Sequence, residues 1–338
     1  METLPEQFEK ARVHIEISDA KRTRAIAAHS EIRACLETDS QLQTWGVDTI
    51  LIGSYARRTA IHPGKDVDVL VKLTGLDVSA SPEQVFGTVS DLLAAKYGDR
   101  AEPQRRSIKV TFDMANHEFA VDVVPAVPTS EHWAIPQRER DLWLADDPSA
   151  RWVETDPERL GELTTELNGK LKIGSRGAFV PTVKLMRQTR RHHLADAKPG
   201  GLYFELLTYW VFDRGIEGGS YAEVLAAALE SVSAQLADGS ALVDPALDKP
   251  FDPAPAPAER AAAAQLYSQL SEKAARALNV PRCRAAVLWR EILGENERGQ
   301  CFPLPEGCDE EGREISPITA VASMGSREPS GFAASRNA

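Results

Sequence analysis

The sequence predicts an α+β fold, in which a small mixed sheet with helices packed on it is followed by a helical C-terminal domain. Between residues 47 and 124, short segments alternate apolar and polar residues, which is typical of strands. After Pro125 this alternation gives way to loops and to stretches of helical spacing. We therefore expect a sheet-containing part over residues 1–150 and a helical part over 151–295. A flexible tail is expected over 296–338, where Gly, Pro, Ser and acidic residues mix with little periodicity.

The first part begins with helical spacing from Pro5 to about Thr38, divided at Ser18, which is a candidate N-cap. The elements expected after it are a strand at 47–52, a helix at 82–97, and a hairpin of strands at 105–114 and 119–124 joined at 115–118. Together they predict a sheet with helices behind it.

The second part is expected to begin with a connector that contains Pro128 and Pro136, and then to be helical. Asp156-Pro157 is a helix start with proline at the first position, and Ser220-x-x-Glu223 is a capping box. Helices are expected at 157–167, 179–194, 202–212, 221–236, 258–278 and 282–293, with a proline-rich loop at 244–257.

Composition narrows the possible classes of protein. The 338 residues are 43% hydrophobic and 26% charged, as in an ordinary soluble globular protein, and we expect a cytoplasmic monomer without a membrane segment. The net charge of −11 argues against a long nucleic-acid partner. The cysteines at 35, 283, 301 and 308 lack zinc-ligand spacing, so we expect them to be structural thiols.

Three aspartates are the candidate catalytic and metal-binding residues. Asp66 and Asp68 are two residues apart in an expected strand, so both carboxylates project to one face while Val67 and Val69 point to the other. Asp122 lies in a later expected strand. Three carboxylates brought together would repel by roughly 4 kcal/mol for each pair at 4 Å and an effective dielectric near 20. The site therefore needs a divalent cation, although a lone Asp-x-Asp is more often the solvated face of a strand.

Two further groups could bind phosphates. Gly53 and Ser54 end a strand where a helix begins, so the backbone can approach a phosphate that faces the helix N–H groups, although they could equally form a plain turn and cap. Lys184, Arg187 and Arg191 have helical spacing and form one cationic stripe. That stripe either faces the site or is an exposed helix face.

The combination of these motifs resembles a known family. The segments GSYARRTAIHPGKDVDVLV, VDVVPA and WVETDPERLGELTTELN are similar to those of polymerase-β-like nucleotidyltransferases. Within that superfamily they look most like the bacterial cGAS-like enzymes, the CD-NTases, which are relatives of oligoadenylate synthase. The resemblance runs from about residue 6 to about residue 295.

The resemblance implies a polymerase-β-like core, a helical domain and a cleft between them. It implies an Mg²⁺-dependent enzyme that makes a cyclic di- or oligonucleotide from nucleoside triphosphates in antiphage (CBASS-type) signalling. Asp66, Asp68 and Asp122 would then hold two Mg²⁺ ions, which Mn²⁺ could replace. Gly53, Ser54, Lys184 and Arg187 would contact the triphosphate of the donor nucleotide.

This chain departs from the family pattern at two positions. The family has a lysine where Arg187 falls, and a serine or glutamine near Gly201. Two alternatives remain open: a linear nucleotidyltransferase that extends RNA ends or adenylylates a small molecule, and a nucleotide sensor of the same fold. An ancillary protein could act at the C-terminal tail, Ser316 to Ala338.

Overall fold

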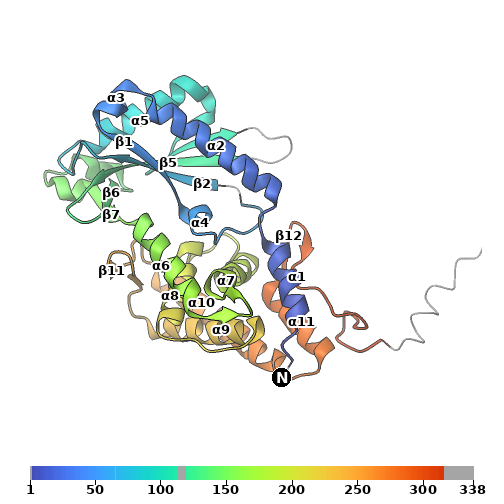
Figure 1. The fold of residues 1–338 in the computed structure, drawn as a ribbon. Coiled ribbons are helices and arrows are strands. Elements are labelled where there is room, and N and C mark those ends of the chain that lie inside the picture. The colour runs from blue at the N-terminus through green and yellow to red at the C-terminus, as the bar shows by residue number, and fades with distance from the viewer. Residues whose placement is uncertain (1, 65, 113–118, 316–338) are drawn as a thin grey trace, which may run out of the picture.

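A mixed sheet with its helices forms one part of the molecule, and a group of packed helices forms the other (Figure 1). The computed structural model describes residues 2–64, 66–112 and 119–315. The short helix α4 (Gly53–Ala56) lies between the two parts, directly after the first strand of the sheet. The predicted α+β fold is therefore confirmed.

The sheet has seven strands in the order β1-β2-β5-β4-β3, and β6 and β7 extend it from the end of β5. The strands are β1 (Val47–Ile52), β2 (Asp66–Leu73), β3 (Ala101–Pro103), β4 (Ile108–Phe112), β5 (Phe119–Pro128), β6 (Trp133–Pro136) and β7 (Trp152–Thr155). Only β2 and β5 pair in parallel; the other neighbours described are antiparallel. The predicted hairpin is present as β4 and β5, and its turn at 115–118 lies outside the described residues.

One face of the sheet is apolar because valines alternate along β2 and β5. Val67, Val69, Val121 and Val123 are fully buried in a single apolar cluster with residues of α2 (Asp19–Glu37) and α5 (Pro82–Tyr97). Ser18 caps α2 through the backbone N–H of Lys21, as expected. The opposite face of the sheet carries the polar residues of the same strands.

The helical part is built around a second apolar cluster. Its helices are α6 (Pro157–Lys170), α7 (Phe179–Leu194), α8 (Gly201–Asp213), α9 (Tyr221–Asp238), α10 (Pro257–Ala277) and α11 (Arg282–Leu293). Helix α1 (Pro5–Ile15) also belongs here, since Phe8 and Ile15 are buried in this cluster and not in the cluster of the sheet. No helix among the described residues is both long enough and apolar enough to cross a membrane.

The smaller elements join these units. They are α3 (Ser40–Thr44), the 3-10 helices at Gly98–Arg100, Arg140–Leu144 and Pro148–Arg151, and the short strand pairs β8 (Lys172–Ile173) with β9 (Arg176–Gly177), β10 (Val243–Asp244) with β11 (Lys249–Pro250), and β12 (Glu295–Asn296) with β13 (Gly299–Gln300). The connector after Pro125 is thus more regular than expected, because β5 continues to Pro128 and β6 ends at Pro136. Both prolines lie at strand ends, where the missing N–H interrupts no ladder.

The prediction of a flexible tail from residue 296 is wrong as far as Ile315. After β12 and β13 the chain returns over the helical part, where Cys301 and Phe302 are fully buried. The ring of Phe302 lies edge-on to that of Phe8, with 5.0 Å between centroids. Residues 316–338 lie outside the described part of the chain.

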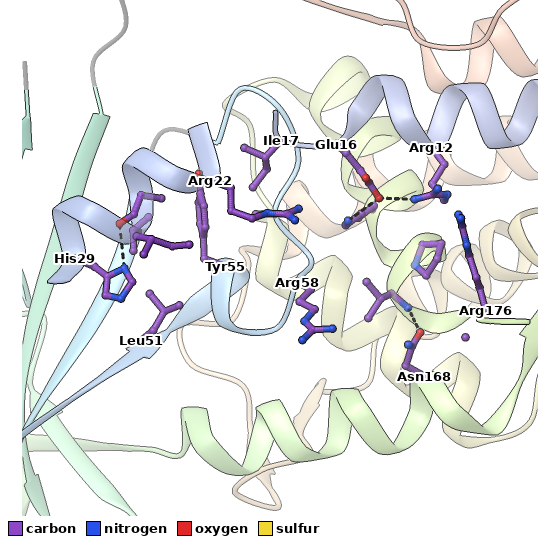
Figure 2. Close-up of a pocket in the computed structure, with 18 residues that line it drawn as sticks. Arg12, Glu16, Ile17, Arg22, His29, Leu51, Tyr55, Arg58, Asn168 and Arg176 are labelled. Atoms are coloured by element: carbon purple, nitrogen blue, oxygen red, sulfur yellow. Dashed lines mark hydrogen bonds and ion pairs between the residues drawn. The ribbon is translucent and has the colours of Figure 1, made fainter. Parts of the chain in front are cut away.

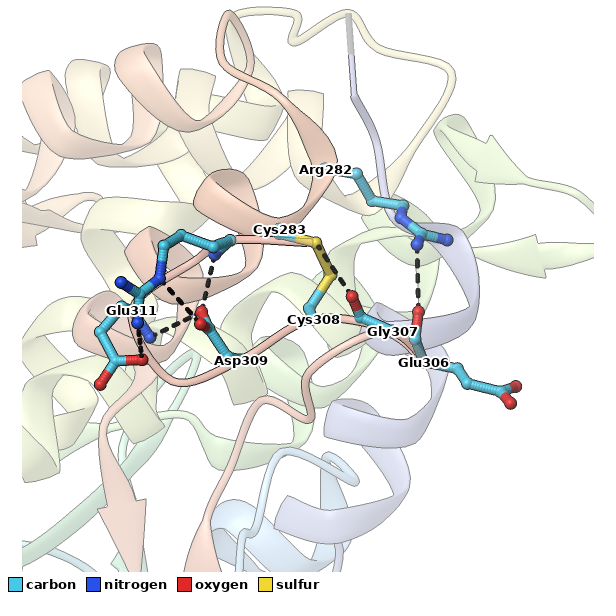
Figure 3. Close-up of a disulfide and its surroundings, with 8 residues drawn as sticks. Arg282, Cys283, Glu306, Gly307, Cys308, Asp309 and Glu311 are labelled. Atoms are coloured by element: carbon cyan, nitrogen blue, oxygen red, sulfur yellow. Dashed lines mark hydrogen bonds and ion pairs between the residues drawn. A yellow bond between two sulfur atoms is a disulfide. The ribbon is translucent and has the colours of Figure 1, made fainter. Parts of the chain in front are cut away.

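A disulfide between Cys283 and Cys308 fastens this returning segment to α11 (Figure 3). Arg282 supports the same junction by donating a hydrogen bond to the carbonyl oxygen of Glu306, at 3.0 Å. The expectation of four unpaired structural thiols therefore holds only for Cys35 and Cys301.

Candidate active site

Three aspartates lie on the polar face of the sheet. Asp68 and Asp122 are direct partners on the parallel strands β2 and β5, and Asp66 precedes Asp68 by two residues. Direct partners in a sheet point to the same side, as do residues two apart in a strand. The three carboxylates therefore share one face, opposite the buried valines.

Burial and mutual repulsion perturb these carboxyl groups. Burial, and after it the charge of Asp122, raises the pKa of Asp68 to about 6 against the opposing effect of the Arg57 guanidinium. Burial likewise raises the pKa of Asp122 to about 6, with a contribution from Asp66. The Oδ1 atom of Asp122 is buried and has no hydrogen-bond partner among the residues that the structure describes. This oxygen lacks the stabilisation that a buried polar atom normally has.

The donor set is suitable for a hard divalent cation. Carboxylate oxygens are the ligands that Mg²⁺ prefers, and the unsatisfied Oδ1 atom of Asp122 is a candidate ligand. Within the described residues, no three acidic, histidine or cysteine side chains are yet gathered as a metal site. A bound cation would offset the repulsion between these like charges.

The Gly53-Ser54 turn lies directly beside the aspartates. Gly53 has a φ of +69°, and a Cβ atom on it would overlap the carboxylate of Asp68. Within the described part of the chain, the N-cap residue Ile52 makes no side-chain hydrogen bond to the first turn of α4, which leaves its N–H groups uncapped. The turn thus brings backbone donors close to Asp68, as a phosphate site requires.

The cationic stripe on α7 points into the protein and not to solvent. Arg187 donates to Glu205 Oε2 at 3.1 Å, and Lys184 Nζ lies 3.1 Å from Glu16 Oε1. Arg191 donates to the carbonyl oxygen of His62. The three cations therefore have separate partners, and the phosphate-binding roles of Lys184 and Arg187 stay predictions.

Glu205 is a residue at the site that the sequence did not reveal. It is 2% exposed on α8, and it accepts hydrogen bonds from Arg57 Nε at 2.7 Å and Thr59 Oγ1 at 3.1 Å as well as from Arg187. Its only signal in the sequence is a single acid inside an apolar helix. This cluster ties the segment that follows Gly53-Ser54 to the helical part.

A pocket of about 740 Å³ lies between the two parts of the molecule, where the resemblance implies a cleft. Its lining includes Lys184 but none of the three aspartates. The aspartates and this pocket are therefore separate features.

This arrangement of a mixed sheet and a helical part, with three aspartates on one face of the sheet, is the fold of a polymerase-β-like nucleotidyltransferase. Solved structures share it: CdnC from E. coli MS115-1, determined with ATP, superposes with a TM-score of 0.68 at 16% identity, covering 88% of this chain and 98% of CdnC. The CD-NTase CdnG from Bradyrhizobium diazoefficiens, determined with GTP, gives a TM-score of 0.63 at 14% identity, covering 81% of this chain and 92% of CdnG.

Sequence comparison gives the family. Residues 1–168 match the family model described as the Second Messenger Oligonucleotide or Dinucleotide Synthetase (SMODS) domain. This half of the chain belongs to that family, which is the nucleotidyltransferase domain of the CD-NTases. A cyclic AMP-AMP-AMP synthase from an Acinetobacter species is 29% identical over 215 residues, which cover 61% of this chain and 57% of the relative. The match thus spans a little over half of that relative's length.

Proposed function

We propose that this protein is an Mg²⁺-dependent nucleotidyltransferase that joins nucleoside triphosphates into a cyclic di- or oligonucleotide. The observation that carries the proposal is the parallel register that sets Asp68 beside Asp122, with Asp66 on the same face. Similarity to a cyclic AMP-AMP-AMP synthase supports a cyclic product.

Each residue of the site has a role in the proposed mechanism. Asp66, Asp68 and Asp122 would hold the metal ions, and Mg²⁺, when bound, would supply charge neutralisation and activation of an acceptor hydroxyl. Asp122 is also the candidate acceptor of that hydroxyl's proton, through the carboxylate oxygen that would not bind the metal. Gly53 and Ser54 bring backbone N–H groups to the leaving phosphates.

Arg187 would hold the same triphosphate from α7, and a phosphate-binding role for Lys184, which lines the separate pocket, stays a prediction. Only one N–H group of Arg187 is directed at Glu205, and a guanidinium has five. Arg187 can therefore retain Glu205 while it binds a phosphate oxygen. Lys184 can likewise share its three donors between Glu16 and a phosphate.

We extend the proposal to antiphage signalling in the cytoplasm, where nucleoside triphosphates are available. CdnC has been solved in complex with a HORMA protein, which supports an ancillary partner for this chain. The expected contact of such a partner, Ser316 to Ala338, lies outside the described residues.

The deciding experiment incubates the pure protein with labelled ATP, GTP, CTP and UTP plus Mg²⁺ or Mn²⁺, and then digests the products with phosphatase. A phosphatase-resistant product and pyrophosphate release are expected. A phosphatase-sensitive product would instead identify a linear nucleotidyltransferase. No pyrophosphate release with any nucleotide mixture would identify a sensor.

A further inference from the structure

The pocket of about 740 Å³ is a second candidate binding site, distinct from the aspartates (Figure 2). Leu51 and Val67 form part of its wall. Val67 alternates with Asp66 and Asp68, so it points to the other face of the sheet, and Leu51 shares that face because it pairs with Val69. The pocket thus opens behind the sheet, between the sheet and the helical part. Its volume is typical of sites for small ligands.

The pocket is strongly cationic in a chain whose net charge is −11. Among the described residues that line it, Glu16 is the one carboxylate, and five cations accompany it: Arg12, Arg22, Arg58, Arg176 and Lys184. Glu9, outside the lining, pairs with both Arg12 and Arg176 at 2.7 Å.

Two of these cations, Arg22 and Arg58, are uncompensated. Neither forms an ion pair or a side-chain hydrogen bond within the part of the chain that the structure describes, and Figure 2 shows both side chains in the middle of the pocket. Two exposed guanidinium groups facing one cavity favour an anionic ligand, because guanidinium matches phosphate and carboxylate geometry.

The backbone at Arg58 is consistent with such a role. Arg58 has a φ of +60°, a left-handed conformation that is unfavourable for residues other than glycine. It lies between the buried residues Arg57 and Thr59, both of which contact Glu205. Those contacts fix its neighbours in the protein interior while the Arg58 side chain is turned into the pocket.

The far end of the pocket is apolar and aromatic. His29, Leu51 and Tyr55 lie at this end in Figure 2, and Arg12, Asn168 and Arg176 lie at the other. Ile26, which also lines the pocket, is 54% exposed although it is a large apolar residue. The Tyr55 hydroxyl donates to the carbonyl oxygen of Gly64 at 3.1 Å, which fixes the ring in place. A flat ring bound there could stack on Tyr55 or His29.

We propose that this pocket is a second nucleotide site, which binds the base of a phosphate-bearing nucleoside at Tyr55 and His29 and its phosphates at Arg22 and Arg58. This inference goes beyond the proposed function, because binding here requires no turnover. Tyr55 and Arg58 belong to the same segment as Gly53 and Ser54. A ligand in the pocket therefore also contacts the segment that carries the Gly53-Ser54 turn.

The test measures binding of labelled ATP by equilibrium dialysis in EDTA. Without divalent metal the three aspartates repel a triphosphate, so binding to the other face of the sheet dominates. We expect wild-type protein to bind ATP, and the double variant Arg22→Glu/Arg58→Glu to bind at least about tenfold more weakly. Arg24→Glu is the matched control, since Arg24 lies on the same helix outside the pocket and should leave binding within about twofold of wild type.

Three results would overturn the proposal: no ATP binding by wild type in EDTA, equal binding by the double variant, or an equal loss in Arg24→Glu. Tripolyphosphate that binds as tightly as ATP would refute the nucleoside half of the assignment. Arg22 and Arg58 are exposed, and a circular dichroism spectrum checks the fold of the double variant. If the double variant unfolds, the single variants Arg22→Glu and Arg58→Glu are measured in the same assay. Each should bind ATP more weakly than wild type, and equal binding by both would overturn the proposal. The assay measures binding without catalysis. A lack of ATP binding would therefore leave the proposed synthase activity untouched, and a protein without synthase activity could still bind ATP in this pocket.

Discussion

Arg57 and Glu205 form a buried ion pair that joins the two parts of the protein, with Nε of Arg57 2.7 Å from Oε1 of Glu205. Arg57 ends the short helix α4 beside the candidate active site, and Glu205 lies on α8 in the helical part. Arg187 holds the second oxygen of Glu205 at 3.1 Å. The position of the Gly53-Ser54 turn relative to α7 and α8 therefore depends on one carboxylate.

Replacing Glu205 with Gln should destabilise the protein strongly. The variant leaves the guanidinium of Arg57 buried without its counter-charge, and breaking such a pair from one side costs about 3–5 kcal/mol. Urea unfolding should show this loss. The matched control is Glu6→Gln, which breaks the exposed Glu6–Lys10 pair and should leave the midpoint unchanged. If the two substitutions lower the urea midpoint equally, the buried pair contributes no more to stability than the exposed pair does.

The contribution of Glu205 to stability should also depend on pH. Burial alone would raise the pKa of Glu205, but the charges of Arg57 and Arg187 outweigh burial and hold the pKa below its ordinary value. The unfolded chain then binds the proton more tightly, so this contribution is complete above about pH 4.3 and is lost as the pH falls through the lower folded pKa. The unfolding free energies of wild type and Glu205→Gln should therefore converge below about pH 4. A constant difference from pH 7 down to the acid transition would contradict the assignment.

Gly53→Ala should reduce both activity and stability. The residue has a φ of +69°, and the added methyl group would overlap the carboxylate of Asp68, so either the turn or Asp68 must move. We expect turnover to fall by about 100-fold, as for a misplaced catalytic group. Gly87→Ala is the control, because no atom of the described residues outside the local helix backbone lies within 4 Å of its Cβ position in α5. That change should be neutral or stabilise the protein by about 0.4–1 kcal/mol.

Local signals in the sequence predicted most of the individual elements. Pro82 at the start of α5 and Ser220 before α9 mark helix ends through their own chemistry, and the helix expected at 179–194 has those bounds in the structure. The period of two in β2 also sufficed to put Asp66 and Asp68 on one face. The pairing of Asp68 with Asp122 depends on how β2 and β5 align in the sheet. These strands lie far apart in the sequence, so no local pattern could establish their register.

The features missed from the sequence all depend on partners far along the chain. Glu205 is stabilised by Arg57, 148 residues away, so its burial could not be anticipated from an apolar helix. The segment after Glu295 is ordered because Phe302 packs on Phe8 and Cys308 bonds to Cys283. Its composition alone indicates a flexible tail. Contacts of this kind can order a segment whose composition predicts flexibility, because they bury apolar side chains against distant parts of the chain.

Asp122→Asn should abolish nucleotide transfer and the response to metal while the protein stays folded. The substitution removes one of three carboxylates that share a face, so we expect a loss of activity of about 100-fold or more. A bound ion stabilises the folded state, by about 2.7 kcal/mol at a hundred times its Kd. The melting temperature of wild type should therefore rise with added Mg²⁺ or Mn²⁺, and that of the variant should not. Asp77→Asn, at an exposed aspartate in the loop after β2, is the control and should respond as wild type does. An Asp122→Asn variant with normal turnover would remove this residue from the active site.

Reducing the Cys283–Cys308 bond should destabilise the returning C-terminal segment. The two residues are 25 apart in sequence, and in the chain-entropy account a cross-link over such a loop contributes about 3 kcal/mol. The melting temperature of wild type should fall when dithiothreitol is added, and Cys308→Ser should have the lower value with or without reductant. Cys35→Ser is the matched control, because Cys35 is an unpaired thiol on α2, and this variant should keep the response of wild type to reductant.

Because a reducing compartment would keep both thiols free, mass spectrometry of alkylated protein taken directly from cells would show which form is populated there. A wild-type melting temperature that is indifferent to reductant, with the bond shown to be oxidised beforehand, would mean that packing of Phe302 alone holds the segment in place.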